Sequence, residues 1–373
     1  MPNSSDNLLY EVALSLVPGV GAVTARQLIS YGGNAEAVWQ MPKAKLLKIP
    51  QVGPHIARQM EAADYLTQAG RIIDEARKQK VELLSYSSAQ YPKRLLHIPD
   101  APLVLYYKGT ADLNALRTVA IVGTREATAY GKLFVEKLIQ DLLPYKPVII
   151  SGLAYGIDIA AHRESLRQGL TTIGIMANGI DIVYPALHKN TAQEMLQAGG
   201  LLTENPFGTK PDAARFPARN RIIAGMADAV VVVEARNKGG AIITAKVAND
   251  YHKEVFALPG NINQPASQGC NELIKTHQAN LITEGQDLVM MLRWQNPTSQ
   301  TNQSQTMRLP LTQLTPLEQQ IISFLRSKPA RKALLDELIQ HTGLTLPQLS
   351  SLLLSLELQG VLCALPGQSY ELL

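Results

Sequence analysis

The sequence predicts an α/β protein in which a doubly wound parallel sheet is flanked by an N-terminal helical domain and a C-terminal winged helix. The sheet is predicted from short runs rich in valine and isoleucine, at residues 118–124, 147–152, 171–179, 229–235 and 254–260. Strands buried on both faces of a sheet have this composition. Because each run precedes a turn and then a helical segment, the strands should be parallel, with ligands at their carboxyl ends.

The first domain, residues 1–85, is expected to be helical and to resemble SAM or helix-hairpin-helix modules. It contains PGVG at 18–21 and PQVG at 50–53, each placed directly before an apolar-periodic helical segment. The free backbone N–H groups of such turns can bind a DNA phosphate. The same turns also connect helices in purely structural bundles, so both interpretations remain open from the sequence.

The last domain, residues 314–373, follows a linker at 294–313 that is rich in Gln, Thr, Ser, Asn and Pro. Three helices and a terminal hairpin fit its pattern, which is typical of a winged helix. The second helix of its helix-turn-helix, LPQLSSLLLSLELQG, contains no Lys or Arg. A helix that reads a major groove lies between phosphates and should be basic, so we expect this domain to contact protein rather than duplex DNA.

The composition limits the classes of protein that fit. The chain has 373 residues, 46% of them apolar and 18% charged, with a net charge of +4. We therefore expect several folded domains, and nucleic-acid binding only through local basic clusters. No apolar run approaches the roughly 20 residues that span a bilayer, and the two cysteines, Cys270 and Cys363, form no disulfide framework. We expect a cytoplasmic protein without a membrane anchor.

The first predicted strand of the central domain, residues 86–293, ends in GTREATAYG, with Gly123, Thr124 and Arg125 at the turn. A dinucleotide-binding turn would carry G-x-G-x-x-G, and the second and third glycines are missing here. Arg125 beside exposed helix N–H groups suits a single phosphate. The alternative is a salt bridge between Arg125 and a carboxylate on a neighbouring element.

The second predicted strand ends at Ser151 and Gly152, which offer a hydroxyl group and a tight turn with outward-facing donors. Asp158 and His162 follow at a spacing of four residues on the next helix. No nucleophile elbow of the G-x-S-x-G type surrounds Ser151. We therefore expect a structural hydrogen bond between Asp158 and His162 rather than a catalytic triad.

Two further strand ends carry basic residues. FPARNRIIAG places Phe216, Arg219 and Arg221 together, and RNKGGAIITA places Lys238 before the glycines that open a helix, with Phe207 as another aromatic residue nearby. Cations that follow phosphates and rings that stack on bases are typical of single-stranded nucleic-acid sites. The same groups would also bind one nucleotide, and the sequence does not separate these two ligands.

Metal and nucleotide cofactors are not expected. The sequence shows no clustered His, Cys, Asp or Glu residues at metal-ligand spacing, and it lacks the P-loop pattern G-x-x-x-x-G-K-[ST].

The motifs AIVGTREATAYG, IISGLAYGIDIAAH, GIDIVYPALH, FPARNRIIAGMADAVVVVEA, GGAIITAKVAND and VFALPGN follow one another in order. Together with YPKRLLHIPDAPLVLYYKG upstream, they resemble the DNA-processing protein A family (DprA, also called Smf) of natural transformation. The resemblance implies a Rossmann-like fold without a cofactor, binding of single-stranded DNA, homodimerisation, and transfer of the strand to the RecA recombinase as single-strand-binding protein is displaced. The sequence departs from the family pattern at GGAIIT, where Gly239 and Ala241 stand in place of residues with hydroxyl side chains. It departs again at KTHQAN, residues 275–280.

The resemblance and the strand ends together give a set of expected site residues. The expected DNA-phosphate-binding residues are Gly123, Thr124, Arg125, Ser151, Gly152, Arg219, Asn220, Arg221, Lys238, Gly239 and Gly240, and Phe216 is expected to stack on a base. Arg219 and Arg221 are expected to contact consecutive phosphates, or one of them a phosphate while the other braces the loop through a salt bridge. No catalytic residue is expected.

The competing hypothesis is an enzyme acting on a nucleotide, such as a phosphoribohydrolase with a related Rossmann-like core. Such enzymes carry an acidic, glycine-rich motif, and the corresponding segment RNKGGAIITA has no glutamate. Glu204 and Glu234, at strand ends, are the acidic residues that could act in its place. A non-enzymatic mediator is therefore the preferred interpretation.

Overall fold

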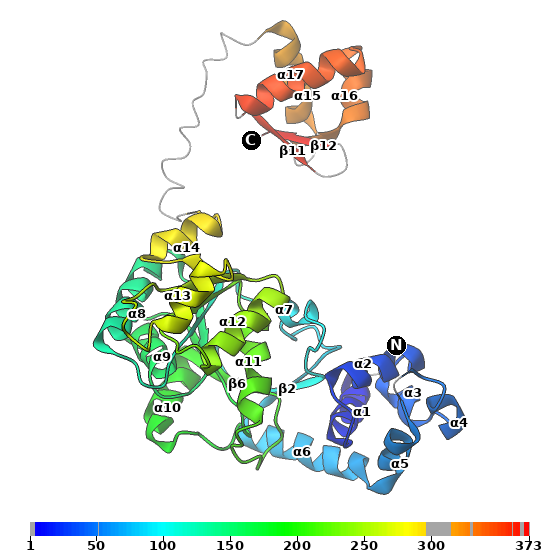
Figure 1. Cartoon of the computed structure of the whole chain (residues 1–373). Coiled ribbons are helices and arrows are strands. Elements are labelled where there is room, and N and C mark those ends of the chain that lie inside the picture. Colours follow the sequence, from blue (N-terminus) through cyan, green and yellow to red (C-terminus); the bar gives the residue numbers. More distant parts are fainter. Residues whose placement is uncertain are drawn as a thin grey trace. The chain divides into compact units, whose positions relative to one another are not determined.

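The computed structural model describes residues 4–50, 52–295, 315–328, 331–359, 361–365 and 369–372. It divides into two compact units, residues 1–295 and residues 296–373 (Figure 1). The predicted linker lies outside the described residues from residue 296 onward. Within the described parts, no helix is long and apolar enough to cross a membrane.

The first unit is built on a nine-stranded sheet with the order β1-β2-β6-β5-β4-β3-β7-β8-β9. The strands are β1 (Glu82–Ser85), β2 (Val104–Gly109), β3 (Thr118–Val122), β4 (Val148–Ser151), β5 (Thr172–Ile175), β6 (Gly199–Thr203), β7 (Ala229–Val232), β8 (Glu254–Ala257) and β9 (Asn280–Leu281). Strands β3 to β9 pair in parallel, and β1 and β2 add antiparallel pairs at one edge. The predicted parallel sheet is confirmed.

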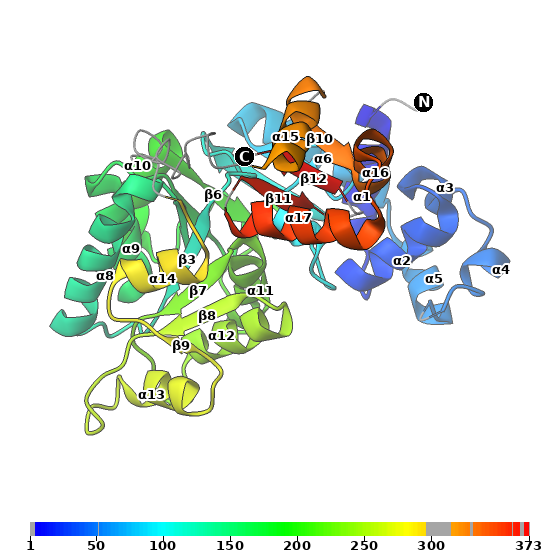
Figure 2. The same ribbon diagram turned by 90° about the horizontal axis from the view of Figure 1, so that it is seen from above.

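Helices cover both faces of this sheet. They are α7 (Lys93–Leu96), α8 (Ala129–Leu142), α9 (Ile157–Arg167), α10 (Lys189–Ala198), α11 (Arg215–Met226), α12 (Gly240–Asp250), α13 (Gln268–Lys275) and α14 (Gly285–Met291), with 3₁₀ turns at Leu143–Tyr145 and Ala186–His188. Figure 2 shows α8 and α9 on the opposite side of the strands from α11 and α12. Alternate residues of β3 follow the same division, since Ile121 packs with α8 and Ala120 with α11.

The N-terminal helices form a bundle with a core of its own. They are α1 (Ser4–Leu16), α2 (Ala22–Gly32), α3 (Ala35–Trp39), α4 (Lys43–Leu46), α5 (Pro54–Ala62) and α6 (Tyr65–Gln79). The two glycine turns precede α2 and α5 as predicted, with Gly21 and Gly53 at the N-caps. The core of the bundle continues into the sheet through Leu103 and Tyr106. The expected domain boundary at residue 85 therefore falls within continuous structure, because β1 already belongs to the sheet.

The second unit is a winged helix with α15 (Pro316–Ser327), α16 (Leu335–Thr342), α17 (Leu346–Leu358), β10 (Lys332–Leu334), β11 (Leu362–Leu365) and β12 (Ser369–Leu372). Its three strands have the order β10-β12-β11. Ile321, Leu338 and Leu353 are fully buried between the helices and the sheet. The predicted three helices and terminal hairpin are confirmed.

Candidate nucleic-acid interface

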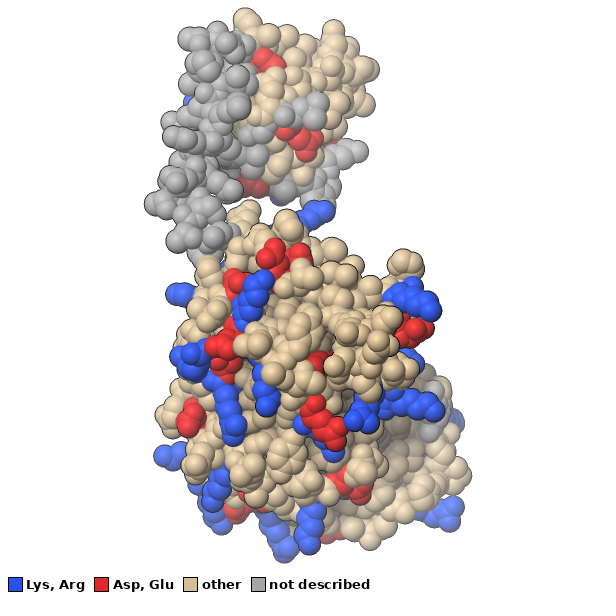
Figure 3. All heavy atoms as spheres, turned by 60° about the vertical axis from the view of Figure 1, so that its left-hand side comes forward, with Lys and Arg blue, Asp and Glu red and all other residues tan. Residues whose placement is uncertain are grey.

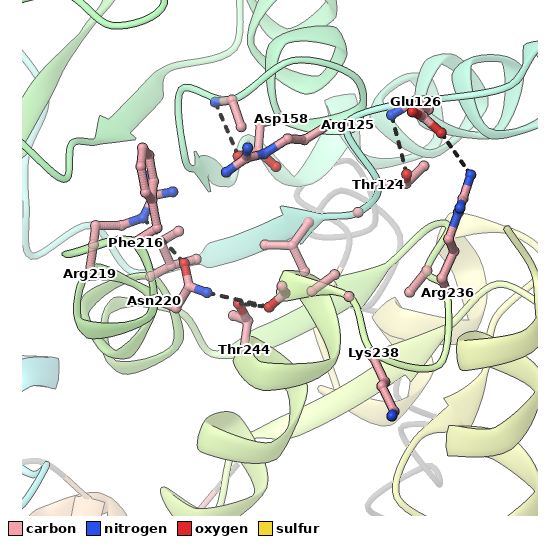
Figure 4. A pocket seen from close by; sticks show the side chains of 18 residues that line it. Thr124, Arg125, Glu126, Asp158, Phe216, Arg219, Asn220, Arg236, Lys238 and Thr244 are labelled. Atoms are coloured by element: carbon pink, nitrogen blue, oxygen red, sulfur yellow. Dashed lines mark hydrogen bonds and ion pairs between the residues drawn. The ribbon is translucent and has the colours of Figure 1, made fainter. Parts of the chain in front are cut away.

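A cavity of about 360 Å³ opens at the carboxyl ends of β3, β4 and β7 (Figure 4). Nine of the residues expected from the sequence line it: Gly123, Thr124, Arg125, Phe216, Arg219, Asn220, Lys238, Gly239 and Gly240. They come from the β3–α8 turn, from α11 and from the β7–α12 turn. The sheet topology brings these segments together, as expected for a doubly wound fold.

The rim of the cavity carries three exposed cations, Arg125, Arg236 and Lys238. The Arg125 guanidinium lies over the Phe216 ring, 5.3 Å from its centroid. Arg236 forms an ion pair of 2.8 Å with Glu126, and both side chains are mostly exposed. Among the described residues no carboxylate lies within 4.0 Å of the Arg125 or Lys238 charge. The salt-bridge alternative for Arg125 is therefore not observed, and both groups are free to meet an anion.

Helix α12 begins at the cavity with no side chain capping its N-terminus. Gly239 is the N-cap residue, and a Cβ atom built on Gly240 would meet nothing within 4 Å. Glycine at 240 is thus not required by packing within the chain, and this first helical residue is exposed, whereas the Ile242 N–H already donates to the Gly239 carbonyl oxygen. The N-terminal backbone and the positive end of the helix dipole favour a bound anion.

The floor of the cavity holds a buried pair of opposite charges, Arg219 and Asp158, which are 6% and 7% exposed. The Arg219 guanidinium donates to the carbonyl oxygen of Ile175 and to Asn220 Oδ1. Burial raises the pKa of Asp158 and lowers that of Arg219, and the charge of each partner opposes the shift of the other. Because the Arg219 guanidinium is buried and bonded within the chain, we expect it to contribute less to ligand binding than the exposed rim cations.

Gly152 lies directly beside this pair. A Cβ atom at this position would come within 2.3 Å of Asp158 Oδ2 and 2.6 Å of the Arg219 guanidinium nitrogens. The glycine therefore makes room for the pair, and it does not line the cavity. Its expected role in phosphate binding stays a prediction.

Two other expected residues point elsewhere. Ser151 is fully buried and its hydroxyl donates to the Ile121 carbonyl oxygen at 2.6 Å, inside the sheet. Arg221 forms ion pairs with Glu204 and Asp100 away from the cavity lining. Of the two roles expected for the arginine pair, the ion pairs of Arg221 match the bracing role.

The expected hydrogen bond between Asp158 and His162 is also wrong. His162 Nδ1 lies 2.7 Å from Thr172 Oγ1, and Nε2 lies 2.6 Å from the Gly152 carbonyl oxygen. Burial lowers the pKa of His162 to about 4, so the ring is neutral near pH 7. Phe207 likewise packs edge-on against Tyr106, in the core shared with the N-terminal bundle rather than in the cavity.

Neither acidic residue considered as a catalytic base faces the cavity. Glu234 is 2% exposed and accepts hydrogen bonds from the backbone N–H and hydroxyl group of Thr128. Glu204 is held by Arg221. The carboxylates that do line the cavity, Glu126 and Asp158, each face an arginine. Within the described residues, no cluster of His, Cys, Asp or Glu could hold a metal ion.

Sequence reasoning missed several residues around the cavity. Arg236 precedes Lys238 in the segment already singled out, and Tyr184 lies in GIDIVYPALH, where its ring approaches Phe216 at 6.1 Å. Lys210 and Tyr155 line adjoining hollows. Arg125 lines the cavity and each of the three hollows that adjoin it. Nothing in the local sequence around Tyr155 or Lys210 marks either as a site residue.

Residues 82–293 match the family model described as DNA recombination-mediator protein A, which covers more than half of the chain. The chain belongs to this family. Residues 305–368 match the DprA winged helix domain. The chain is similar to protein Smf of Synechocystis, with 31% identity over 97% of this chain and 98% of that one. It is also 42% identical to DNA processing protein DprA of Streptococcus pneumoniae, over 57% of this chain and 74% of the relative.

Two solved structures of this family resemble the fold. The DprA structure from Streptococcus pneumoniae matches with a TM-score of 0.67 and 34% identity, covering 76% of this chain and 97% of that one. A DprA structure from Helicobacter pylori, whose description reports a single-stranded DNA binding mode, matches with a TM-score of 0.52 and 32% identity. It covers 57% of this chain and 96% of the Helicobacter chain.

Proposed function

We propose that this chain is a non-enzymatic recombination mediator that binds single-stranded DNA at the cavity formed by β3, β4 and β7. The observation that carries this proposal is the grouping of Arg125, Arg236, Lys238 and the uncapped N-terminus of α12 around one cavity, beside the Phe216 ring. No carboxylate in the lining is free to act as a general base. This arrangement suits binding of a phosphate backbone rather than chemistry on it.

The proposed binding mode assigns phosphate and base to different parts of the site. A phosphate group would be bound by the N–H groups of α12 and by Lys238, and Arg125 would contact the next one. Phe216 offers a ring on which a base can stack, a contact that contributes about 1–3 kcal/mol. The packing of Arg125 on the same ring holds both groups in place before the strand arrives.

The description of the Helicobacter relative supports this proposal, because it names single-stranded DNA for a protein that shares the fold at 32% identity. We further propose that the chain transfers the strand to a RecA recombinase while single-strand-binding protein is displaced, and that it acts as a homodimer in natural transformation. These partners are inferred from membership of the recombination-mediator family. Recombinase loading on a strand coated with single-strand-binding protein is the assay for them.

The first experiment is fluorescence anisotropy with a labelled oligothymidylate and a matched duplex, at several salt concentrations. The wild type should prefer the single strand, with a logarithmic salt slope of about −0.7 for each phosphate contacted. Arg125→Ala should lose most of this affinity. Arg71→Ala removes another exposed arginine, from helix α6 and outside the cavity, and should bind like the wild type. Equal binding to both DNAs, or no effect of Arg125→Ala, would overturn the proposal.

A nucleotide-processing enzyme is the second candidate. The volume of about 360 Å³ is large enough for a nucleotide, which keeps this hypothesis open. It requires release of a base from a nucleoside monophosphate. Release of a base, detected by chromatography, would overturn the mediator proposal. If no base is released and the oligothymidylate is bound, the result would favour the mediator.

A further inference from the structure

We infer that the bound strand continues beyond the cavity along a second groove between α8 and α9, where Lys132 and Arg163 contact its phosphates. This inference rests on the proposed function and extends it to a longer site. The groove has a volume of about 530 Å³ and begins at Arg125, which also lines the central cavity. Its remaining lining comes from α8, α9 and the turns that precede them, so it leads away from the α12 phosphate site.

The carboxylates in this α8–α9 groove are paired with arginines, which leaves other cations of the groove available to bind phosphates. Three carboxylates line it, and each is held by an arginine: Glu136 and Glu164 by Arg167, and Glu126 by Arg236. These ion pairs leave the other three cations of the groove, Arg125, Lys132 and Arg163, without a carboxylate partner among the described residues.

Lys132 and Arg163 are both exposed, and neither forms an ion pair with a described residue. Arg163 Nε donates to Thr191 Oγ1 at 3.3 Å, a neutral contact that orients the guanidinium without neutralising it. Figure 3 brings the α8–α9 side forward and shows both signs of charge across the surface rather than a uniform basic field. Binding here would therefore depend on these individual cations and not on the overall charge of the face.

Tyr155 connects the two parts of the site. Its side chain is 45% exposed and lines both the α8–α9 groove and the small apolar hollow beside Phe216. The ring packs edge-on against His188, with 5.0 Å between centroids, which fixes its orientation. An exposed, oriented ring between two phosphate-binding regions is suited to stack on a base of the passing strand.

The alternative that these observations disfavour is a closed pocket for one nucleotide. Such a pocket buries most of its ligand and has no need for cations in an adjoining groove. Here the central cavity continues on one side to Lys210 and on the other to Lys132 and Arg163, with Arg125 common to all parts. A chain of several nucleotides fits this open arrangement, because its phosphates recur along its length.

The test compares a short and a long oligothymidylate, of about 4 and about 16 nucleotides, which span the usual range of single-strand site sizes. The variant combines Lys132→Ala and Arg163→Ala. For the long strand its affinity should fall by about tenfold, and its salt slope should become shallower by about 1.4, which corresponds to two lost contacts. For the short strand, bound at the central cavity, its affinity should match that of the wild type, which also shows that the variant is folded.

A charge-matched control, Lys78→Ala combined with Lys275→Ala, removes two exposed lysines that line neither the cavity nor the groove. It should leave both affinities unchanged. The inference is overturned if the groove variant binds the long strand like the wild type, or if it weakens both strands equally. If the proposed function itself is wrong, the result is different: the wild type would bind neither strand, and Arg125→Ala would not change the affinity for either.

Discussion

Replacing Arg221 should weaken the fold and leave DNA binding intact, although Arg221 lies two residues from Arg219 in the same motif. Its guanidinium forms an ion pair with Glu204, bonds the Asp100 carbonyl oxygen, and lies 3.8 Å from the Asp100 carboxylate. Only 15% of the Arg221 side chain and 24% of the Glu204 side chain is exposed. Arg221→Met would therefore leave the Glu204 carboxylate mostly buried without a cation.

The expected magnitude follows from that burial. Removing one partner of a fully buried ion pair costs about 3–5 kcal/mol, and water reaches part of this pair. We therefore expect Arg221→Met to lower the free energy of unfolding by about 2–3 kcal/mol, and the melting temperature by about 4–10 °C. The cost arises largely from the uncompensated Glu204 charge, so Glu204→Gln introduced into Arg221→Met should recover part of the loss.

The assay is thermal unfolding followed by circular dichroism, together with oligothymidylate anisotropy below the melting transition. Arg125→Ala is the contrasting variant, because Arg125 is exposed and forms no ion pair with a described residue; its stability should remain within about 0.5 kcal/mol of the wild type. The reasoning would be refuted if Arg221→Met kept the wild-type melting temperature while losing affinity for DNA. It would also be refuted if Glu204→Gln gave no recovery.

Three further results are expected. Glu126→Gln should tighten single-strand binding about threefold without changing stability, because it releases Arg236 from an exposed ion pair that is worth at most about 1 kcal/mol; weaker binding in anisotropy would contradict this. Deleting residues 300–373 should leave single-strand affinity nearly unchanged, since α17 carries no Lys or Arg; a large loss would show that the winged helix binds the strand. The third result concerns Glu11, which is 1% exposed and whose pKa is raised by burial. The folded chain then holds this proton more tightly, so the contribution of Glu11 to stability should fall as pH rises above 4.5 towards the folded-state pKa, and Glu11→Gln should lack this contribution to the pH dependence. Urea unfolding at several pH values measures the difference, and a difference that is independent of pH would be inconsistent with it.

The central strands could be predicted because strands buried on both faces have a recognisable local composition, a short run of aliphatic residues. The runs at β3 and β7 are largely aliphatic, and a helix follows each of them after a turn. The edge strands were not predicted as strands. β9 has only two residues, and β1 pairs antiparallel with β2 at the junction with the helical bundle. Their place in the sheet depends on partners distant in sequence, which a local pattern does not contain.

Part of the site could also be predicted, because turns after parallel strands meet at one edge of a sheet. What failed was the direction of individual side chains. Arg219 and Arg221 lie on helix α11, where residues two positions apart point about 200° away from each other. One arginine therefore faces the cavity floor and the other faces Glu204, an arrangement that supports the bracing role of Arg221 over a second phosphate contact.

The net charge of +4 does not indicate an anion site, because most charges around the cavity compensate one another. Asp158 lies near the buried Arg219 in the floor, and Glu126 forms an ion pair with Arg236 at the rim. What remains is Arg125, Lys238 and the helix N-terminus, a small excess of positive charge around a concave site. A single phosphate would use only part of this excess. A strand that contacts Arg125 at the junction between cavity and groove would meet cations on both sides, so the arrangement favours a polymer over a free nucleotide.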